Sequence, residues 1–222
     1  MKKYIPGLLA FALAVTACNL DEEFSATNIT DLVTVESNTS LVNDYGTVYH
    51  ITADMSDHDW AIGDRLYALF DLLNSNYDIT LKSYSKCIVI KPVPYPEGDF
   101  PVPMADPVII DGNSISAGYV NLQLTYYKQK NSNFAHRILM YYKDKPDSQQ
   151  MELYLVHQGN GENPANLEDD ELETVTALFS FPLAGLAPGG SRRTVYLTYN
   201  ELYNNSQVVS RSAKLYDQDI YF

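Results

Sequence analysis

The chain has 222 residues, of which 45% are hydrophobic and 12% aromatic. This is enough apolar material for one or two packed cores, which excludes gross disorder. The formal net charge of -13 gives a surface that repels phosphate backbones, so nucleic acid is not an expected partner. With 18 Tyr against one Trp, and with 11 Gly and 11 Pro, the composition favours many short strands joined by turns. We expect an all-β protein.

The N-terminus has the features of a secretory signal peptide: two lysines, an apolar run over residues 7–15, and small residues before a cysteine. The apolar run is about half of the ~20 residues that a membrane-spanning helix needs. Residues 15–18, Val-Thr-Ala-Cys, resemble the bacterial lipobox, in which the peptide is cut before the cysteine and the cysteine carries lipid. We therefore predict a signal peptide over 1–17 and an acyl anchor on Cys18. An ordinary signal peptide cut near Ala17 is the alternative.

An acidic cluster follows the expected lipid cysteine. Removal of the signal peptide takes away two lysines and no acidic residue, so the formal charge would change from -13 to -15. Asp21, Glu22 and Glu23 resemble the surface-export signal of lipoproteins in some anaerobic Gram-negative bacteria. We expect an outer-membrane protein exposed at the cell surface. In the alternative interpretation, the three acids only form a solvated tether.

The first half of the chain predicts a tether, a small domain and a linker. Residues 18–40 are polar and acidic with few large apolar side chains, so we predict a flexible tether there. Residues 41–91 contain short strand patterns and predict a small barrel. Six prolines fall within 92–107, and because each proline lacks a backbone donor, we predict a linker and domain boundary.

The second half, residues 108–222, has clear period-two alternation of apolar and polar residues. About seven strands are predicted, enough for a sandwich of two antiparallel sheets. A short helix is predicted over 166–172, where Asn166 could cap a turn rich in acids. The predicted strands cover residues 119–126, 136–142, 151–157, 175–181, 193–199, 207–212 and 215–221.

Few residues have a pattern typical of catalysis or metal binding. Cys87 lies in an apolar run and is interpreted as a small buried hydrophobe. The four histidines lack zinc-site spacing, and we interpret His136 and His157 as a structural pair on neighbouring strands, with a metal site as the alternative. The acids of 54–59 lack the glycine and distal glutamate of a calcium loop, and those of 168–173 indicate an exposed loop. We predict neither catalysis nor a cofactor nor a metal.

Several segments resemble the NigD-like lipoproteins. Tyr-Gly-Thr-Val at 45–48 and Gly-Asp-Arg-Leu at 63–66 resemble segments of that family's first domain, and further motifs follow in the second half. The order and spacing of these motifs cover nearly the whole chain after the lipobox. The resemblance implies an N-terminal OB-like barrel followed by a C-terminal β-sandwich on a lipid anchor. The family-like positions, whose role is unknown, are Gly63, Asp64, Arg65, Tyr119, Asn121, His136, His157, Gly161 and Glu162.

This chain departs from the family pattern at three places in one segment. Val156 stands where the family usually has Arg, Gln158 where it has Asn, and Glu162 where it has Asp. Any role attached to that Arg is therefore not carried over. The family's name comes from a gene near a bacteriocin locus, which suggests a link to immunity.

From these patterns we expect a non-catalytic, monomeric binding protein of the cell envelope, whose partner is an extracellular or envelope protein or a glycan. One alternative is a glycan-binding accessory of a polysaccharide uptake system, because Tyr pairs at 126–127 and 141–142 place one ring outward and could stack on sugar. Another is a fimbrial subunit assembled by strand addition.

Overall fold

The structure, a computed structural model, describes residues 24–54, 57–96, 105–116, 118–189, 191–204, 207–215 and 220–221. Cys18, the predicted signal peptide and the acidic residues Asp21, Glu22 and Glu23 lie outside these residues. The chain divides into two compact units between Ile88 and Val89. No helix among the described residues is both long and apolar enough to cross a membrane.

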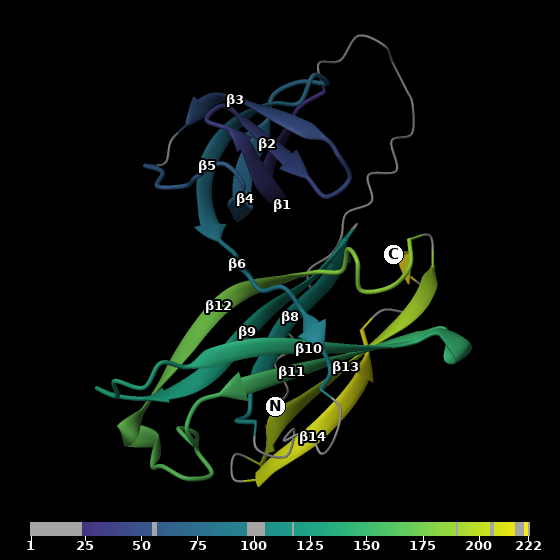
Figure 1. Ribbon diagram of the computed structural model, residues 1–222. Helices are drawn as coiled ribbons and strands as arrows, with labels where there is room; N and C mark the ends of the chain where they lie inside the picture. The colour runs from purple at the N-terminus through teal and green to yellow at the C-terminus, as the bar shows by residue number, and fades with distance from the viewer. Residues whose placement is uncertain are drawn as a thin grey trace. The chain divides into compact units, whose positions relative to one another are not determined.

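The first unit is a closed five-stranded barrel with the strand order β1-β2-β3-β5-β4 (Figure 1). Neighbouring strands are antiparallel except β3 and β5, which are parallel. This is the small OB-like barrel predicted for this part of the chain. The strands are β1 (Ala26–Ser37), β2 (Ser40–Asn43), β3 (Val48–Asp54), β4 (Arg65–Leu72) and β5 (Asp78–Lys86).

The prediction of a flexible tether up to residue 40 is wrong for its second half, because β1 is a full strand of the barrel. β1 pairs with both β2 and β4. Its Val33 and Val35 are buried in the barrel core beside Leu41 and Phe70. The sequence looked polar because a strand with one solvated face needs an apolar residue only at every second position.

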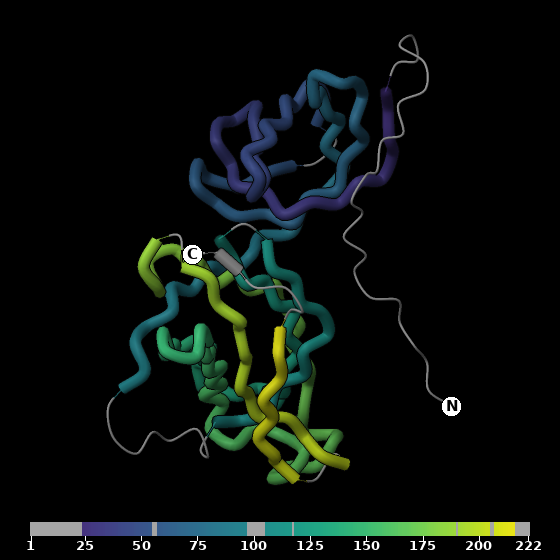
Figure 2. Tube along the Cα trace, turned by 90° about the vertical axis from the view of Figure 1, so that its right-hand side faces the viewer, coloured from purple at the N-terminus to yellow at the C-terminus, as the bar shows by residue number. Residues whose placement is uncertain are grey.

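The second unit is a sandwich of two sheets (Figures 1 and 2). One sheet has the order β14-β13-β11-β10-β7, with β15 also paired to β13, and the other has the order β6-β12-β9-β8. Most pairs are antiparallel as predicted, but β11 with β13 and β10 with β7 are parallel. The strands are β6 (Ile88–Val89), β7 (Val93–Pro94), β8 (Ile109–Ser116), β9 (Tyr119–Gln129), β10 (Arg137–Lys145), β11 (Gln150–Gln158), β12 (Leu172–Pro182), β13 (Arg192–Tyr203), β14 (Gln207–Lys214) and β15 (Ile220–Tyr221).

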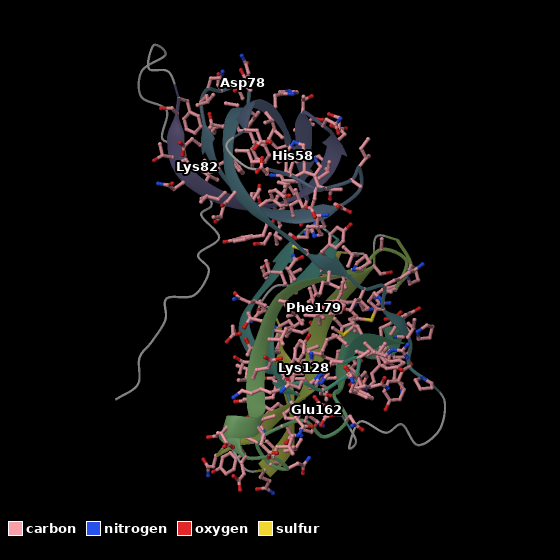
Figure 3. The ribbon with its side chains drawn as sticks, turned by 90° about the vertical axis from the view of Figure 1, so that its left-hand side faces the viewer. His58, Asp78, Lys82, Lys128, Glu162 and Phe179 are labelled. Carbon is pink, nitrogen blue, oxygen red and sulfur yellow. The ribbon has the colours of Figure 1, made fainter. Side chains whose placement is uncertain are left out.

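The sandwich core is built from the alternating apolar residues that predicted its strands. Leu122 on β9, Leu153 on β11, Leu197 on β13 and Phe181 on β12 are at most 1% exposed. Phe179, labelled in Figure 3, packs into the same core. Each sheet therefore buries one face against the other, and the outer faces carry the polar residues of the pattern.

The proline-rich segment is not simply a linker between two bodies. Val93 and Pro94 form β7, which pairs in parallel with Tyr141 and Tyr142 of β10. Tyr95 then donates its backbone N–H to the Tyr142 carbonyl at 2.8 Å. Proline is tolerated here because β7 is an edge strand, in which only one side of the backbone needs a partner.

Two other short elements differ from prediction. The helix expected over 166–172 is reduced to the 3-10 helix η3 (Asp169–Glu171), and its cap is Glu168, which forms a capping box with Glu171. Asn166 instead donates its side-chain N–H to the Gly161 carbonyl at 2.9 Å. A second 3-10 helix, η2 (Pro146–Ser148), lies between β10 and β11. Strand β8 was not predicted.

Candidate functional site

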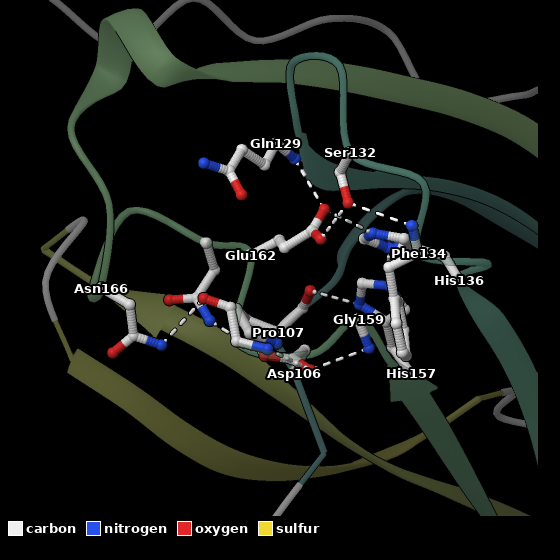
Figure 4. Close-up of polar contacts among 12 residues, drawn as sticks. Asp106, Pro107, Gln129, Ser132, Phe134, His136, His157, Gly159, Glu162 and Asn166 are labelled. Atoms are coloured by element: carbon white, nitrogen blue, oxygen red, sulfur yellow. Dashed lines mark hydrogen bonds and ion pairs between the residues drawn. The ribbon is translucent and has the colours of Figure 1, made fainter.

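Three family-like residues that are distant in sequence meet in the sandwich and form a buried polar cluster, called here the histidine cluster: His136, His157 and Glu162 (Figure 4). His136 directly precedes β10, His157 lies near the end of β11, and Glu162 lies in the loop that follows β11. Nδ1 of His136 is 2.9 Å from Nε2 of His157. Nε2 of His136 is 2.9 Å from Oε2 of Glu162.

The cluster is shielded from water by aromatic rings. The side chains of His136 and Glu162 are 5% and 4% exposed, and His157 is 1% exposed. The Tyr126 ring contacts both imidazoles, with centroids 5.5 Å from His136 and 4.8 Å from His157. Phe134 meets His136 edge-on at 5.8 Å. Polar groups buried to this degree must find hydrogen-bond partners among themselves.

The partners determine which nitrogen atoms carry protons. The Pro107 carbonyl can only accept, so Nδ1 of His157, at 3.2 Å, is the donor. Burial is the main cause that lowers the pKa of His157 to about 4, so the ring is neutral at pH 7 and its Nε2 accepts a hydrogen bond. Nδ1 of His136 must then donate to it. The other nitrogen of His136 faces the Glu162 carboxylate at 2.9 Å, so His136 lies between the two other members of the cluster and contacts both.

Glu162 is held as a carboxylate by three donors. Burial alone would raise the pKa of Glu162, but hydrogen bonds from Ser132, from the Gln129 backbone and from His136 outweigh it and lower the pKa below its ordinary value. The Gln129 N–H lies 2.7 Å from Oε2, and the Ser132 hydroxyl lies 2.6 Å from Oε1. The cluster thus connects the end of β9, the start of β10 and the loop after β11.

Asp106 anchors the loop that carries Glu162, and it was not recognised in the sequence. Its Oδ2 accepts the N–H groups of Gly159 and Gly161 at 2.8 and 3.2 Å, and its Oδ1 accepts the side-chain N–H of Asn163 at 3.0 Å. Its own backbone N–H donates to the His157 carbonyl at 2.8 Å. The sequence signal that could have indicated this loop is the pair of glycines two residues apart after His157.

Glycine is needed at positions 159 and 161 for different structural reasons. Gly161 has φ +76°, in the region that favours glycine. At Gly159 an added Cβ would lie 2.8 Å from Cε1 of His157 and 3.1 Å from Cε1 of His136. The bare backbone at Gly159 therefore lets the loop close directly over the two imidazoles.

The structure places the other family-like residues elsewhere, in structural roles. In the barrel, Gly63 has φ +92°, and the Asp64 carboxylate accepts the Ala61 N–H at 2.9 Å to close the turn before β4. Arg65 then makes a bidentate ion pair with Asp44, with both N–O distances 2.6 Å. Because a buried pair of this kind costs much to break, it fixes the β2–β3 turn to β4.

In the sandwich, Asn121 on β9 connects three adjacent strands of one sheet, β12, β9 and β8. Its Oδ1 accepts the Ser180 hydroxyl of β12 at 2.8 Å, and its Nδ2 donates to Ser116 of β8 at 3.0 Å. Tyr119 begins β9 and is paired with Pro182. Neither residue lies in the histidine cluster.

The geometry of the histidine cluster does not match a hydrolytic triad. Ser132 donates to the Glu162 carboxylate and not to a histidine, so its hydroxyl lacks the imidazole partner of a Ser-His-Asp triad. The two histidines direct their nitrogens at each other, at Glu162 and at a carbonyl, which leaves no lone pair aimed at a shared point. In the described part of the chain, no group of three or more His, Cys, Asp or Glu is arranged to hold a metal ion. Cys87 is buried, as expected for a small hydrophobe.

Comparison with known proteins identifies the second unit by sequence. The family model described as the NigD-like C-terminal beta sandwich domain matches residues 99–212. This range includes every residue of the histidine cluster and its anchor Asp106. No curated protein sequence matches the chain.

Solved structures share the fold over most of the chain. A protein described as a NigD-like immunity protein from Bacteroides caccae is 18% identical, with a TM-score of 0.61 over 84% of this chain and 93% of that one. A protein of unknown function from Bacteroides vulgatus is 18% identical, with a TM-score of 0.64 over 85% of this chain and 90% of that one. A candidate lipoprotein from Bacteroides fragilis is 13% identical, with a TM-score of 0.55 over 86% and 99%.

Proposed function

The chain belongs to the NigD-like family, and on this premise we propose that it is a lipid-anchored, non-catalytic binding protein at the outer surface of a Gram-negative outer membrane. The observation that carries the proposal is the lipobox at 15–18, which would place two or three acyl chains on Cys18. The likeness in fold to a candidate lipoprotein supports the same anchor.

The acidic cluster after the anchor supports exposure outside the cell. Asp21, Glu22 and Glu23 directly follow the first residues of the proposed mature chain. A body with a formal charge of -15 would be repelled by an anionic membrane surface, so it would extend away from the membrane that holds it.

The architecture supports binding in preference to catalysis. The buried polar cluster is closed to solvent and is saturated by its own hydrogen bonds, so a substrate has no access to it. The sandwich instead offers wide sheet faces, on which β-sandwich proteins commonly bind their partners. Because the Bacteroides caccae protein is described as an immunity protein, a secreted bacteriocin is one class of partner to test.

The anchor can be tested by detergent partition of the full chain expressed in a Bacteroides host. We expect the native protein in the detergent phase and in the membrane fraction. Cys18→Ala should move to the aqueous phase, because it loses the acyl chains, while its circular dichroism stays unchanged. A Cys18→Ala protein that remains in the detergent phase would refute the lipid anchor.

A further inference from the structure

The outer face of the sheet β14-β13-β11-β10-β7 carries tyrosines and lysines in two adjacent rows, as the strand register shows. Residues between these positions, such as Leu153, Leu155 and Leu197, are buried in the core. Because side chains alternate along a strand, the rows point away from the core. One row across the strands is Lys143, Glu152, Tyr196 and Lys214, and the next is Tyr141, Tyr154, Thr198 and Ser212.

The aromatic part of this face is held in place by neighbouring groups. The rings of Tyr95 and Tyr154 pack at 4.5 Å with their planes tilted by 52°. The Tyr154 hydroxyl donates to Glu152 at 2.7 Å, and Lys145 donates to the other oxygen of Glu152 at 2.5 Å. Tyr141 lies directly opposite Tyr154 on the neighbouring strand, and like Tyr95 and Tyr154 it is partly exposed. The rings are therefore positioned before any ligand binds, which lowers the entropy cost of binding.

The charge of this face is opposite to that of the whole chain. The two rows and the adjoining position 145 contain three lysines, Lys143, Lys145 and Lys214. The same positions contain one carboxylate, that of Glu152. The chain as a whole has 15 basic and 28 acidic residues. A locally positive face on such an acidic protein would attract anions to one place and repel them elsewhere.

We propose that this face, named here the tyrosine–lysine face (Tyr95, Tyr141, Tyr154, Tyr196, Lys143, Lys145, Lys214 and Glu152), binds an acidic polysaccharide. The apolar side of a sugar ring would stack on the tyrosines, and its carboxylate or sulfate groups would pair with the lysines. Glu152, Thr198 and Ser212 offer acceptors to sugar hydroxyls, which a phosphate backbone does not have as donors. This proposal rests on the proposed function only in one respect, namely that a protein at the cell surface would meet glycans.

The test is affinity electrophoresis and calorimetry of the full chain, in detergent, with three acidic polysaccharides: hyaluronan and polygalacturonate, which carry carboxylates, and chondroitin sulfate, which adds sulfate. Dextran serves as the neutral polysaccharide, and a thymidine oligonucleotide as the nucleic acid. We expect binding to at least one acidic polysaccharide, weakened by at least tenfold between 50 and 500 mM salt, because screening removes the lysine contribution. The polymer that binds shows whether the face recognises a carboxylate or a sulfate.

Matched variants locate the site. Lys143→Glu and Tyr154→Ala should each weaken binding by at least tenfold. Lys130→Glu makes the same charge change at an exposed position directly after β9, and Tyr127→Ala removes a partly exposed ring from the other sheet. Both variants should bind within twofold of the native protein. Circular dichroism confirms that each variant is folded.

Several results would overturn the proposal. They are absence of binding to all three acidic polysaccharides, equal binding to dextran, tighter binding to the oligonucleotide, and equal loss in the control variants. The binding assay does not depend on the location of the protein, so a failed lipid anchor and a failed glycan site give separate results.

Discussion

At the residue scale, the histidine cluster explains four of the family-like positions through one hydrogen-bond chain. His136, His157 and Glu162 form the chain, and Gly161 lies in the loop that closes it. The sequence predicted the two histidines as a pair because His136 begins one predicted strand and His157 ends its neighbour. It could not predict Asp106 or Ser132, because both are short polar residues in loops, and their partners are decided only by the way the loops fold.

Gly159→Ala tests the closure of the loop over the imidazoles. The new methyl group would lie within 2.8 Å of the His157 ring, so a ring or the loop must shift. We expect a loss of about 1–3 kcal/mol in the free energy of unfolding, measured by urea denaturation with circular dichroism. Gly189→Ala is the control, since nothing lies within 4 Å of its added Cβ. Equal effects of the two substitutions would contradict the packing described here.

The cluster also predicts how stability depends on pH. The pKa of His157 is about 4 in the folded protein and about 6.5 when unfolded, so below pH 6.5 protons bind preferentially to the unfolded chain. The contribution of His157 to stability should be constant above pH 6.5 and fall by up to about 3 kcal/mol as the pH approaches 4. Glu162, whose pKa is lowered by folding, should add a further loss only below about pH 4.5.

Urea denaturation at intervals from pH 8 to pH 4 measures this dependence. In His157→Asn the loss between pH 6.5 and 4.5 should be smaller, because the group that resists protonation is gone. A native protein of constant stability across that interval would show that His157 is not held neutral by burial.

At the scale of the elements, the sandwich strands were well predicted and the barrel boundaries were not. In β9, β11 and β12 the apolar core residues recur at every second position, so local sequence contains most of the signal, although Asn121, Val156 and Ser180 between them are buried as well. In β1 the outward residues are Thr, Asp and Glu, which by composition are typical of a tether. Its membership in the barrel depends on pairing with β4, more than 30 residues away, which no local pattern can reveal.

Val33→Ala distinguishes a barrel strand from a tether. Val33 is fully buried in the barrel core, so the substitution should cost about 1–3 kcal/mol. Trp60, the single tryptophan, belongs to the same core, and its fluorescence in urea reports the barrel directly. Glu36→Ala, at an exposed position of the same strand, should leave the midpoint of urea unfolding unchanged within experimental error. If both substitutions left it unchanged, β1 would not contribute to the barrel.

At the scale of the whole molecule, the order of the motifs correctly predicted a small barrel followed by a sandwich. It did not predict where the boundary between the two units lies. Six prolines suggested a boundary within 92–107, but the second unit already begins at Val89 and takes β7 into its sheet. Proline content indicates where a central strand is excluded, and an edge strand remains allowed. The proposed lipid anchor and export signal, by contrast, rest on the sequence alone.

The protein body is proposed to lie outside the cell on a lipid anchor. The most direct measurement is protease digestion of intact producing cells, followed with an antibody to the sandwich unit, with a periplasmic protein as the control for leakage. We predict rapid loss of the sandwich signal while the periplasmic control persists. Replacement of Asp21, Glu22 and Glu23 by alanine should protect the protein. Full protection of the native protein in intact cells, with digestion only after lysis, would contradict surface exposure.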